Sequence, residues 1–334
     1  SSGNWPWVFS MSYSIFLVPI LALGAGIVFL FLCFFFEWVE RKAIARVQKR
    51  IGPYFTGPGG ILQPVADFLK LLGKREIISE GTDILLYRLS PLVGVTLLTY
   101  GFLHIPFFSK SSILSFNGDL LVILVIFALT SFSYLMAGMS IKTPFTLVGT
   151  SRLIVQYSLY ELIFLSCFAI IFLQVGSATI SEIVQYQVQN VPIIVYQPIG
   201  FAVAVISLLA KLEKPPFDLP HAKQEIAAGW MSELSGRTLA YIRLSGDMDF
   251  TLSIFLIVSL FLGGGYGPLV SSLPILWPIY FLLKSIALII LLAFIEGVAV
   301  RVRSMLLPMR LALPLASMLV IQALIITSWR MGLW

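Results

Sequence analysis

Long apolar segments recur along the chain and are separated by shorter polar stretches. A helix needs roughly 20 residues to cross a hydrocarbon core about 30 Å thick, and these segments are about that long. Pro192 and Pro198 interrupt the start of the fifth segment, which is the least regular. We expect one all-α integral membrane domain over residues 1–334, with eight transmembrane helices at about 12–36, 84–107, 119–140, 154–176, 193–212, 238–264, 275–300 and 311–330.

A shorter amphipathic stretch follows the first span. Residues 61–72 place apolar side chains at helical spacing on one face, with Asp67 and Lys70 outside that face. Two breaks precede the stretch, at Gly52-Pro53 and at residues 57–60. Because a helix of this length cannot span a bilayer, we expect a short interfacial amphipathic helix, at the membrane surface or beneath a partner.

The composition agrees with a membrane protein. Hydrophobic residues make up 58% of the chain and charged residues only 11%, too few to cover a soluble protein of this size. A net charge of +6 could indicate a nucleic-acid partner. In so apolar a chain, the excess of positive charge instead indicates loops that face an anionic membrane surface.

The positions of the basic residues predict the orientation. Lys110 and Arg330 lie on the side of the even-numbered loops, and Lys284 lies within the seventh span. By the positive-inside rule, both termini are outside the cell membrane, and two long docking loops, about 37–83 and 211–237, are cytoplasmic. The other 19 of the 22 basic residues flank the odd-numbered loops: Arg41, Lys42, Arg46, Lys49, Arg50, Lys70, Lys74, Arg75, Arg88, Lys142, Arg152, Lys211, Lys214, Lys223, Arg237, Arg243, Arg301, Arg303 and Arg310.

The residue types that usually hold metals are scarce. Cys33 and Cys167 lie far apart in apolar runs and do not form an iron–sulfur or zinc pattern. His104 and His221 lie at a span edge and in a polar loop, whereas a transmembrane b-type haem needs histidines within facing spans. The sequence therefore predicts no metal site, no catalytic residue and no redox cofactor within this chain.

Ionisable residues inside spans are the strongest functional candidates, because each costs about 2.5–3.5 kcal/mol or more when it faces lipid. Glu161 lies in the fourth span, and Lys284 and Glu296 lie in the seventh. A buried carboxyl can exchange protons, although it can also make a purely structural hydrogen bond to a neighbouring helix. At the start of the sixth span, Arg243 and Asp247 are at i, i+4 and are expected to pair. That pairing would leave Asp249 as the freer carboxyl.

The two long loops contain different groups of charged residues: the first opens with a basic stripe, and the second contains a run of carboxylates. Basic residues recur at i, i+4 at the start of the first loop, which predicts that the first helix continues past the bilayer. The second loop is interrupted by prolines and then predicts a helix-like stretch, along which His221, Glu225, Gly229 and Glu233 repeat every four residues. Its carboxylates either form a solvated surface or titrate as a coupled set. The loop acids are Glu213, Asp218, Glu225 and Glu233, and the basic stripe is Lys42, Arg46 and Arg50.

Several motifs resemble the family of the H-type membrane subunit of respiratory complex I, called NADH dehydrogenase subunit 1 in mitochondria. The resemblance covers essentially the whole chain. It implies eight transmembrane helices, an interfacial helix after the first, and a platform for a peripheral electron-transfer arm. The motifs are Glu40-Arg41-Lys42, Arg50-Ile51-Gly52-Pro53, Gly60-Ile61-Leu62-Gln63-Pro64-Val65-Ala66-Asp67, Arg152-Leu153-Ile154-Val155-Gln156, Tyr160-Glu161 and Pro216-Phe217-Asp218-Leu219-Pro220.

The resemblance also suggests roles for individual residues. Docking of the peripheral arm is expected to involve Glu40, Arg41, Lys42, Arg46, Arg50, Gln63, Asp67, Lys211 and Lys214. A proton path towards antiporter-like subunits is expected to draw on Glu161, Glu213, Asp218, Glu225, Glu233, Asp247, Asp249, Lys284 and Glu296.

The chain departs from the quinone-reducing members of this family. Lys211 stands where they have a glutamate, His221 and Lys223 occupy two further acidic positions, and Glu296 replaces an arginine. An arginine-rich motif of the family is kept only in part, around Arg301 and Arg303. These residues belong to the quinone-access region. We hypothesise that Lys211 and Glu296 form a compensated pair.

The departures favour the ferredoxin-linked relatives, which are membrane-bound [NiFe] hydrogenases and sulfane-sulfur reductases. The expected partners are a hydrogenase-like large subunit, iron–sulfur subunits, antiporter-like membrane subunits, ferredoxin as electron donor, and membrane lipid, with no nucleic acid. Iron–sulfur clusters and, in a hydrogenase, the [NiFe] centre would belong to the partners. The alternatives are a quinone-reducing complex I subunit, an autonomous ion transporter and a scaffold.

Overall fold

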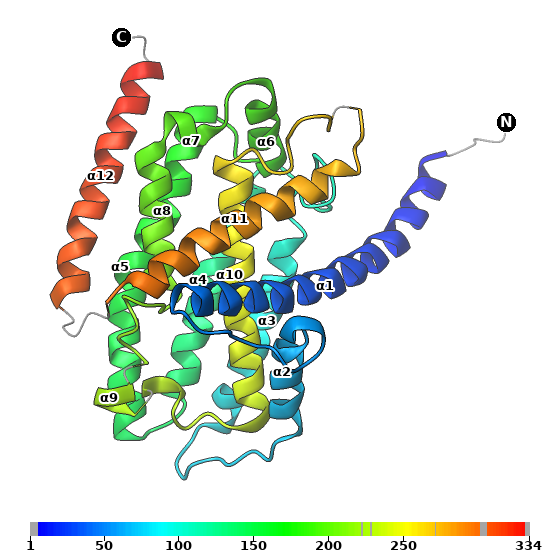
Figure 1. The fold of residues 1–334 in the computed structure, drawn as a ribbon. Coiled ribbons are helices and arrows are strands. Elements are labelled where there is room, and N and C mark those ends of the chain that lie inside the picture. The colour runs from blue at the N-terminus through cyan, green and yellow to red at the C-terminus, as the bar shows by residue number, and fades with distance from the viewer. Residues whose placement is uncertain (1–5, 222, 228, 271, 301–305, 331–334) are drawn as a thin grey trace.

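A computed structural model describes residues 6–221, 223–227, 229–270, 272–300 and 306–330, so Arg301 and Arg303 lie outside the described part. Within it, every regular element is a helix (Figure 1). The α-helices are α1 (Pro6–Val47), α2 (Gln63–Gly73), α3 (Ile84–Phe102), α4 (Asp119–Met139), α5 (Pro144–Val175), α6 (Ile180–Gln189), α7 (Ile193–Tyr196), α8 (Pro198–Lys211), α9 (Lys223–Ile226), α10 (Gly236–Phe261), α11 (Leu276–Val298) and α12 (Leu306–Arg330). Two 3₁₀ turns, η1 (Pro58–Gly60) and η2 (Gly229–Met231), lie in the long loops.

Seven of the described helices are long and apolar enough to cross a membrane: α1, α3, α4, α5, α10, α11 and α12. This confirms an all-α integral membrane protein. The fifth expected span differs from the others, because it is divided into α7 and the 14-residue α8. Pro198 cannot continue a helix from α7, since it has no N–H to donate. Side chains from neighbouring helices bond at this break, where Gln322 donates to the Tyr196 carbonyl at 3.2 Å and Gln197 donates to Gln174 at 2.6 Å.

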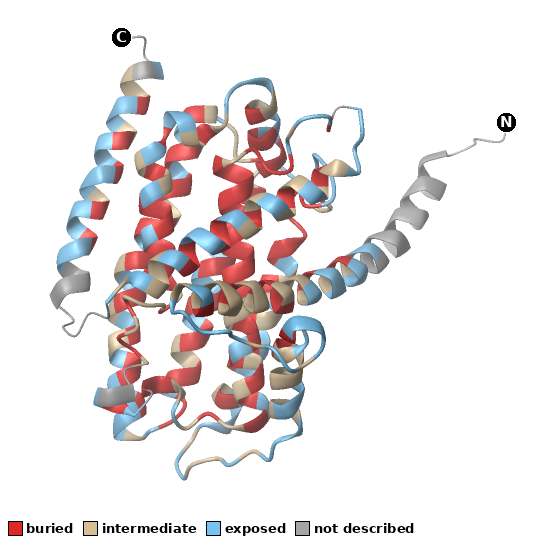
Figure 2. Cartoon of the chain, in the orientation of Figure 1, coloured by how far each residue is buried: buried red, intermediate tan, exposed pale blue. Residues whose placement is uncertain are grey.

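Helix α10 forms the centre of the bundle. It contacts α1, α2, α3, α6, α7, α8 and α11, and 89% of its most apolar stretch is buried, against 28–50% for the other candidate spans. Figure 2 shows this difference along the helices. Helices α1 and α11 pack together and cross the central group at a steep tilt, while α12 packs on α5 and α8 at one side (Figure 1).

The short amphipathic helix expected at residues 61–72 is confirmed as α2. It packs on α1 and α10, with the Phe68 ring 5.7 Å from that of Phe34. The turn before it requires Gly60, whose φ is +81° and where a Cβ atom would lie 2.4 Å from the carbonyl of Pro53. That close approach folds the first long loop back on itself.

The prediction of a helix-like stretch in the second long loop is wrong. The structure has only the four-residue α9 and the turn η2 there. Left-handed backbone at Ala227 (φ 51°) and Gly229 (φ 65°) interrupts the helix. At Gly229 a Cβ atom would lie 1.7 Å from the carbonyl oxygen of Pro220, so the loop packs on itself. His221, Glu225 and Glu233 therefore do not share one helix face.

Candidate functional site

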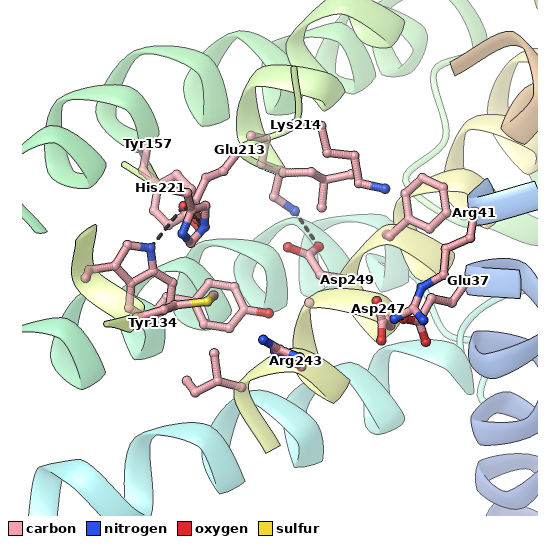
Figure 3. Close-up of a pocket in the computed structure, with 17 residues that line it drawn as sticks. Glu37, Arg41, Tyr134, Tyr157, Glu213, Lys214, His221, Arg243, Asp247 and Asp249 are labelled. Carbon is pink, nitrogen blue, oxygen red and sulfur yellow. Dashed lines mark hydrogen bonds and ion pairs between the residues drawn. The ribbon is translucent and has the colours of Figure 1, made fainter. Parts of the chain in front are cut away.

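A cavity of about 270 Å³ lies where the second long loop meets α1, α4, α5, α8 and α10 (Figure 3). Its lining is rich in charge and nearly balanced in sign. The ionisable side chains are Glu37, Glu213, Asp247 and Asp249 on the acidic side, and Arg41, Lys211, Lys214 and Arg243, with His221, on the basic side. Tyr134, Tyr157, Trp230 and Phe250 provide the aromatic part of the wall.

A buried ion pair between Lys211 and Asp249 lies in the cavity wall. Lys211 ends α8, and its Nζ is 2.7 Å from Oδ1 of Asp249, with side chains 0% and 3% exposed. The ammonium also lies 3.7 Å from the centre of the Phe127 ring. The prediction that Asp249 is the freer carboxyl is therefore wrong, and so is the hypothesis that Lys211 pairs with Glu296.

The Glu213 carboxylate has three partners. It accepts hydrogen bonds from the Tyr157 hydroxyl at 2.6 Å and the Trp230 indole at 3.0 Å, and lies 2.7 Å from Nε2 of His221. Burial alone would raise the pKa of Glu213, but the His221 charge and these hydrogen bonds outweigh it and hold the pKa below its usual range. Glu213 is therefore held as an anion at the loop end of the cavity.

A second charged group joins α1 to α2 and α10. Arg41 pairs with Glu37 one turn earlier and with Asp67 of α2 at 2.7 Å. Asp247 of α10 interacts with Glu37. Among the described residues no ion pair forms between Arg243 and Asp247, so that expectation is wrong: Asp247 turns towards α1 instead. Glu37 was missed in the sequence, although its i, i+4 spacing from Arg41 could have revealed it.

Glu296 belongs to a third group, around Lys214. Lys214 pairs with Glu40 of α1, and its Nζ lies 3.5 Å from the centre of the Phe250 ring. Glu296, on α11, interacts electrostatically with both Lys214 and Glu40. The Glu296 carboxylate thus reaches α1 and the second loop rather than Lys211.

Glu161 lies deeper in the membrane-spanning part than the cavity. It is 8% exposed on α5, and its Oε1 has no hydrogen-bond partner among the described residues. The charges that act on it are those of Lys211 and Asp249. The Lys211–Asp249 pair therefore lies between the charged cavity and the intramembrane carboxyl.

A sequence model of the family described as NADH dehydrogenase matches residues 20–328 of the chain. The chain belongs to this family. It is 34% identical over 269 residues to the H subunit of NADH-quinone oxidoreductase from Dehalococcoides mccartyi, covering 80% of this chain and 74% of the relative. It is 32% identical over 304 residues to the H 1 subunit from Rhodopseudomonas palustris, covering 90% and 91%, and 31% identical over 285 residues to the H 2 subunit from Syntrophobacter fumaroxidans, covering 83% and 84%.

The resemblance to the H-type membrane subunit of complex I is thus confirmed, and the chain is a multi-pass membrane subunit of a complex I-type assembly with partner subunits. The other acids expected on the family's proton path are dispersed around the cavity. Glu225 lies 2.7 Å from Arg152, and Glu233 accepts a hydrogen bond from Ser79 at 3.1 Å. Asp218 interacts electrostatically with Glu296.

Lys284 is separate from all of these groups. Its Nζ donates to the backbone carbonyls of Leu262, Gly264 and Tyr266, beyond the C-terminal end of α10. At 1.5 Å per residue, that end lies about 20 Å along α10 from Asp249. The structure therefore places Lys284 away from the other charged residues expected on the proton path.

The expected docking residues fall into three sets. Gln63 donates to Asp67 at 2.8 Å, and Lys42 donates to the carbonyls of Pro53 and Gly59 at 2.9 and 3.0 Å, so these residues shape the first loop. Arg46 and Arg50 are exposed, which leaves them accessible to a partner. Glu40, Lys211 and Lys214 face inward instead. Lys211 is fully buried and cannot offer its side chain to a docked protein.

Proposed function

We propose that this chain anchors the peripheral redox arm of a ferredoxin-linked, complex I-related assembly. In this role it converts charge changes at the docking loops into protonation changes within the membrane. The observation that carries the proposal is a row of charged residues: Glu213 lines the same cavity as the Lys211–Asp249 pair, and the charges of that pair act on Glu161. The row joins a loop at the cavity wall to an intramembrane carboxyl.

Electrostatics gives the row its coupling. Charges in a partly dehydrated site interact by several kcal/mol at contact distance, about 4 kcal/mol at 4 Å for an effective dielectric constant near 20. Reduction in the docked arm, or proton uptake near Glu213, changes the potential at the Lys211–Asp249 pair. That pair faces Glu161, so its rearrangement changes the proton affinity of Glu161. The proton then passes laterally to antiporter-like subunits.

The cavity supports a ferredoxin-linked complex over a quinone-reducing one. Ligand pockets typically measure about 300–1,000 Å³ and carry only a few polar groups, whereas this cavity, at about 270 Å³ close to the lower limit, is lined by four acidic and five basic side chains. A quinone head group that entered it would lie against charged side chains, including the paired Lys211 and Asp249. Electrons in the proposed complex run from ferredoxin through iron–sulfur subunits to a hydrogenase-like large subunit and do not enter the cavity.

The tip of the first long loop supports docking of the arm. Ile51, Tyr54 and Phe55 are 70%, 59% and 96% exposed, and Arg46 and Arg50 are exposed nearby in the sequence. Aromatic side chains and arginine are enriched at protein–protein interfaces. The predicted orientation in the plasma membrane, with both termini outside, places this tip on the cytoplasmic side, where ferredoxin is found.

The second candidate is a quinone-reducing subunit, which the names of the relatives favour. Purification of the intact complex in a mild detergent separates the two. Ferredoxin-dependent hydrogen evolution with a nickel-containing large subunit, or sulfur reduction without nickel, supports the proposal. Reduction of a quinone analogue with neither activity supports the second candidate. Ion transport by the isolated chain in liposomes would overturn both in favour of an autonomous transporter.

A further inference from the structure

The backbone after α10 forms a cluster of convergent carbonyl groups. Gly263 (φ 70°) and Gly264 (φ 56°) both adopt the left-handed conformation, and the Gly264 N–H returns to the Val258 carbonyl at 3.0 Å. This turn directs alternate carbonyls, those of Leu262, Gly264 and Tyr266, to one point. Here we call these three groups the carbonyl cage.

The side chain of Lys284 fills the carbonyl cage. Its Nζ lies 2.7 Å from the Leu262 oxygen, 2.9 Å from that of Gly264 and 2.8 Å from that of Tyr266. An ammonium group has three N–H donors, and each has an acceptor here. The site also lies at a helix C-terminus, where a positive charge is favoured by the helix dipole. Lys284 therefore has both hydrogen-bonding and electrostatic reasons to stay in place.

The geometry points to a monovalent cation site that is filled by a tethered ammonium, with Lys284 acting as a positioning residue for α10 and not as a proton carrier. The cage recognises ammonium-type cations through three carbonyl oxygens. Because α10 carries Asp247 and Asp249, fixing its far end also fixes where these carboxylates stand against α1 and α8.

Neighbouring contacts show that this end of α10 is built as a fixed point. Gln187 of α6 donates to the Ser259 carbonyl at 3.0 Å, so a further carbonyl of the helix end is occupied. At Gly265 a Cβ atom would lie 2.3 Å from the Trp277 carbonyl oxygen, so the loop is packed closely on α11. The Trp277 indole in turn donates to the Pro106 carbonyl at 3.0 Å.

The test uses the purified complex and the melting temperature of this subunit within it. Lys284→Ala empties the cage and leaves room for a free cation, whereas Lys284→Met keeps the side-chain bulk without the charge. Lys110→Ala, at an exposed lysine on the loop between α3 and α4, is the matched control. Each variant is measured with ammonium chloride, with ethylammonium chloride, and with choline chloride at equal ionic strength.

We expect both Lys284 variants to lower the melting temperature by at least roughly 2–4 °C, with no change for the control. Ammonium or ethylammonium should restore the melting temperature of Lys284→Ala but not that of Lys284→Met. Choline should restore the melting temperature of neither variant. An unchanged melting temperature, restoration by all three salts alike, or no restoration of Lys284→Ala would overturn the proposal.

Two further measurements cover assembly and proton transport. In the wild-type complex the Gly264 amide should exchange hydrogen as slowly as the core of α10, and rapid exchange would contradict a fixed cage even if Lys284→Ala fails to assemble. With ammonium present, Lys284→Ala should generate the wild-type membrane potential per electron transferred, measured with a potential-sensitive dye because ammonia collapses a pH gradient. Loss of pumping despite a restored melting temperature would make Lys284 a proton carrier. The melting and exchange results do not depend on the proposed function, so the two can fail separately.

Discussion

Breaking the ion pair between Lys211 and Asp249 should be costly, and the cost can be worked from its geometry. At 2.7 Å and an effective dielectric constant near 20, the attraction is roughly 6 kcal/mol before desolvation is counted. Removal of one partner from a buried pair leaves the other charge unpaired, which typically costs about 3–5 kcal/mol. We therefore expect Lys211→Met to destabilise the subunit by about that amount, and Asp249→Asn to do so by a similar amount.

A double-mutant cycle tests the pairing directly. If the two charges compensate each other, the double variant should be more stable than the sum of the single effects predicts, by at least about 1.5 kcal/mol. The assay is thermal or denaturant unfolding of the purified complex, followed on this subunit. The matched control cycle combines Lys211→Met with Glu296→Gln, which should be additive within about 0.5 kcal/mol. Additive effects for Lys211 and Asp249, or strong coupling to Glu296, would refute the assignment of partners.

Three further changes test other parts of the molecule. Glu161→Gln should abolish redox-driven pumping in proteoliposomes while the complex still assembles, and unchanged pumping would count against the proposed relay. Glu213→Gln should destabilise the subunit at pH 6. Because the folded-state pKa of Glu213 is lowered, the difference in stability between variant and wild type should fade as the pH falls from about 4 through that lowered pKa. A difference in melting temperature that stays constant with pH would contradict this. Gly149→Ala places a Cβ atom 2.3 Å from the backbone nitrogen of Trp230. It should lower the stability of the subunit by about 1–3 kcal/mol and expose the second loop to proteolysis. Gly24→Ala, whose Cβ atom meets nothing within 4 Å, should do neither.

The apolar pattern predicted most of the fold, because each membrane-spanning helix must satisfy its own backbone and be apolar for about 20 residues. That reasoning failed where side chains of neighbouring helices provide the hydrogen bonds that a broken helix lacks. Gln322 and Gln174 bond at the break before α8, so a half-length helix is tolerated there. It failed again in the second loop, where the left-handed residue Ala227 ends a helix that the four-residue repeat had favoured.

The candidate site was predicted as a set of residue types but not as a set of pairs. An ionisable residue in an apolar run is visible in the sequence because its buried charge must have a partner. The partner itself is set by tertiary packing: Lys211 and Asp249 are 38 positions apart. Local spacing suggested Arg243 for Asp247, whereas α1 brings Glu37 to it instead. Pairing across helices thus decided what periodicity along one helix could not.

The position of Lys211 at the last residue of α8 restricts how this subunit can be exchanged with its relatives. A helix C-terminus carries partial negative charge, so it favours the ammonium and would disfavour the glutamate that the sequence resemblance implies at this position in quinone-reducing members of the family. Returning that glutamate alone would set two carboxylates against each other, with Asp249 opposite. A chimera between this subunit and a relative with that glutamate should therefore assemble only when the end of α8 and the facing turn of α10 are transferred together. The transferable unit is the wall of the cavity, not the single residue.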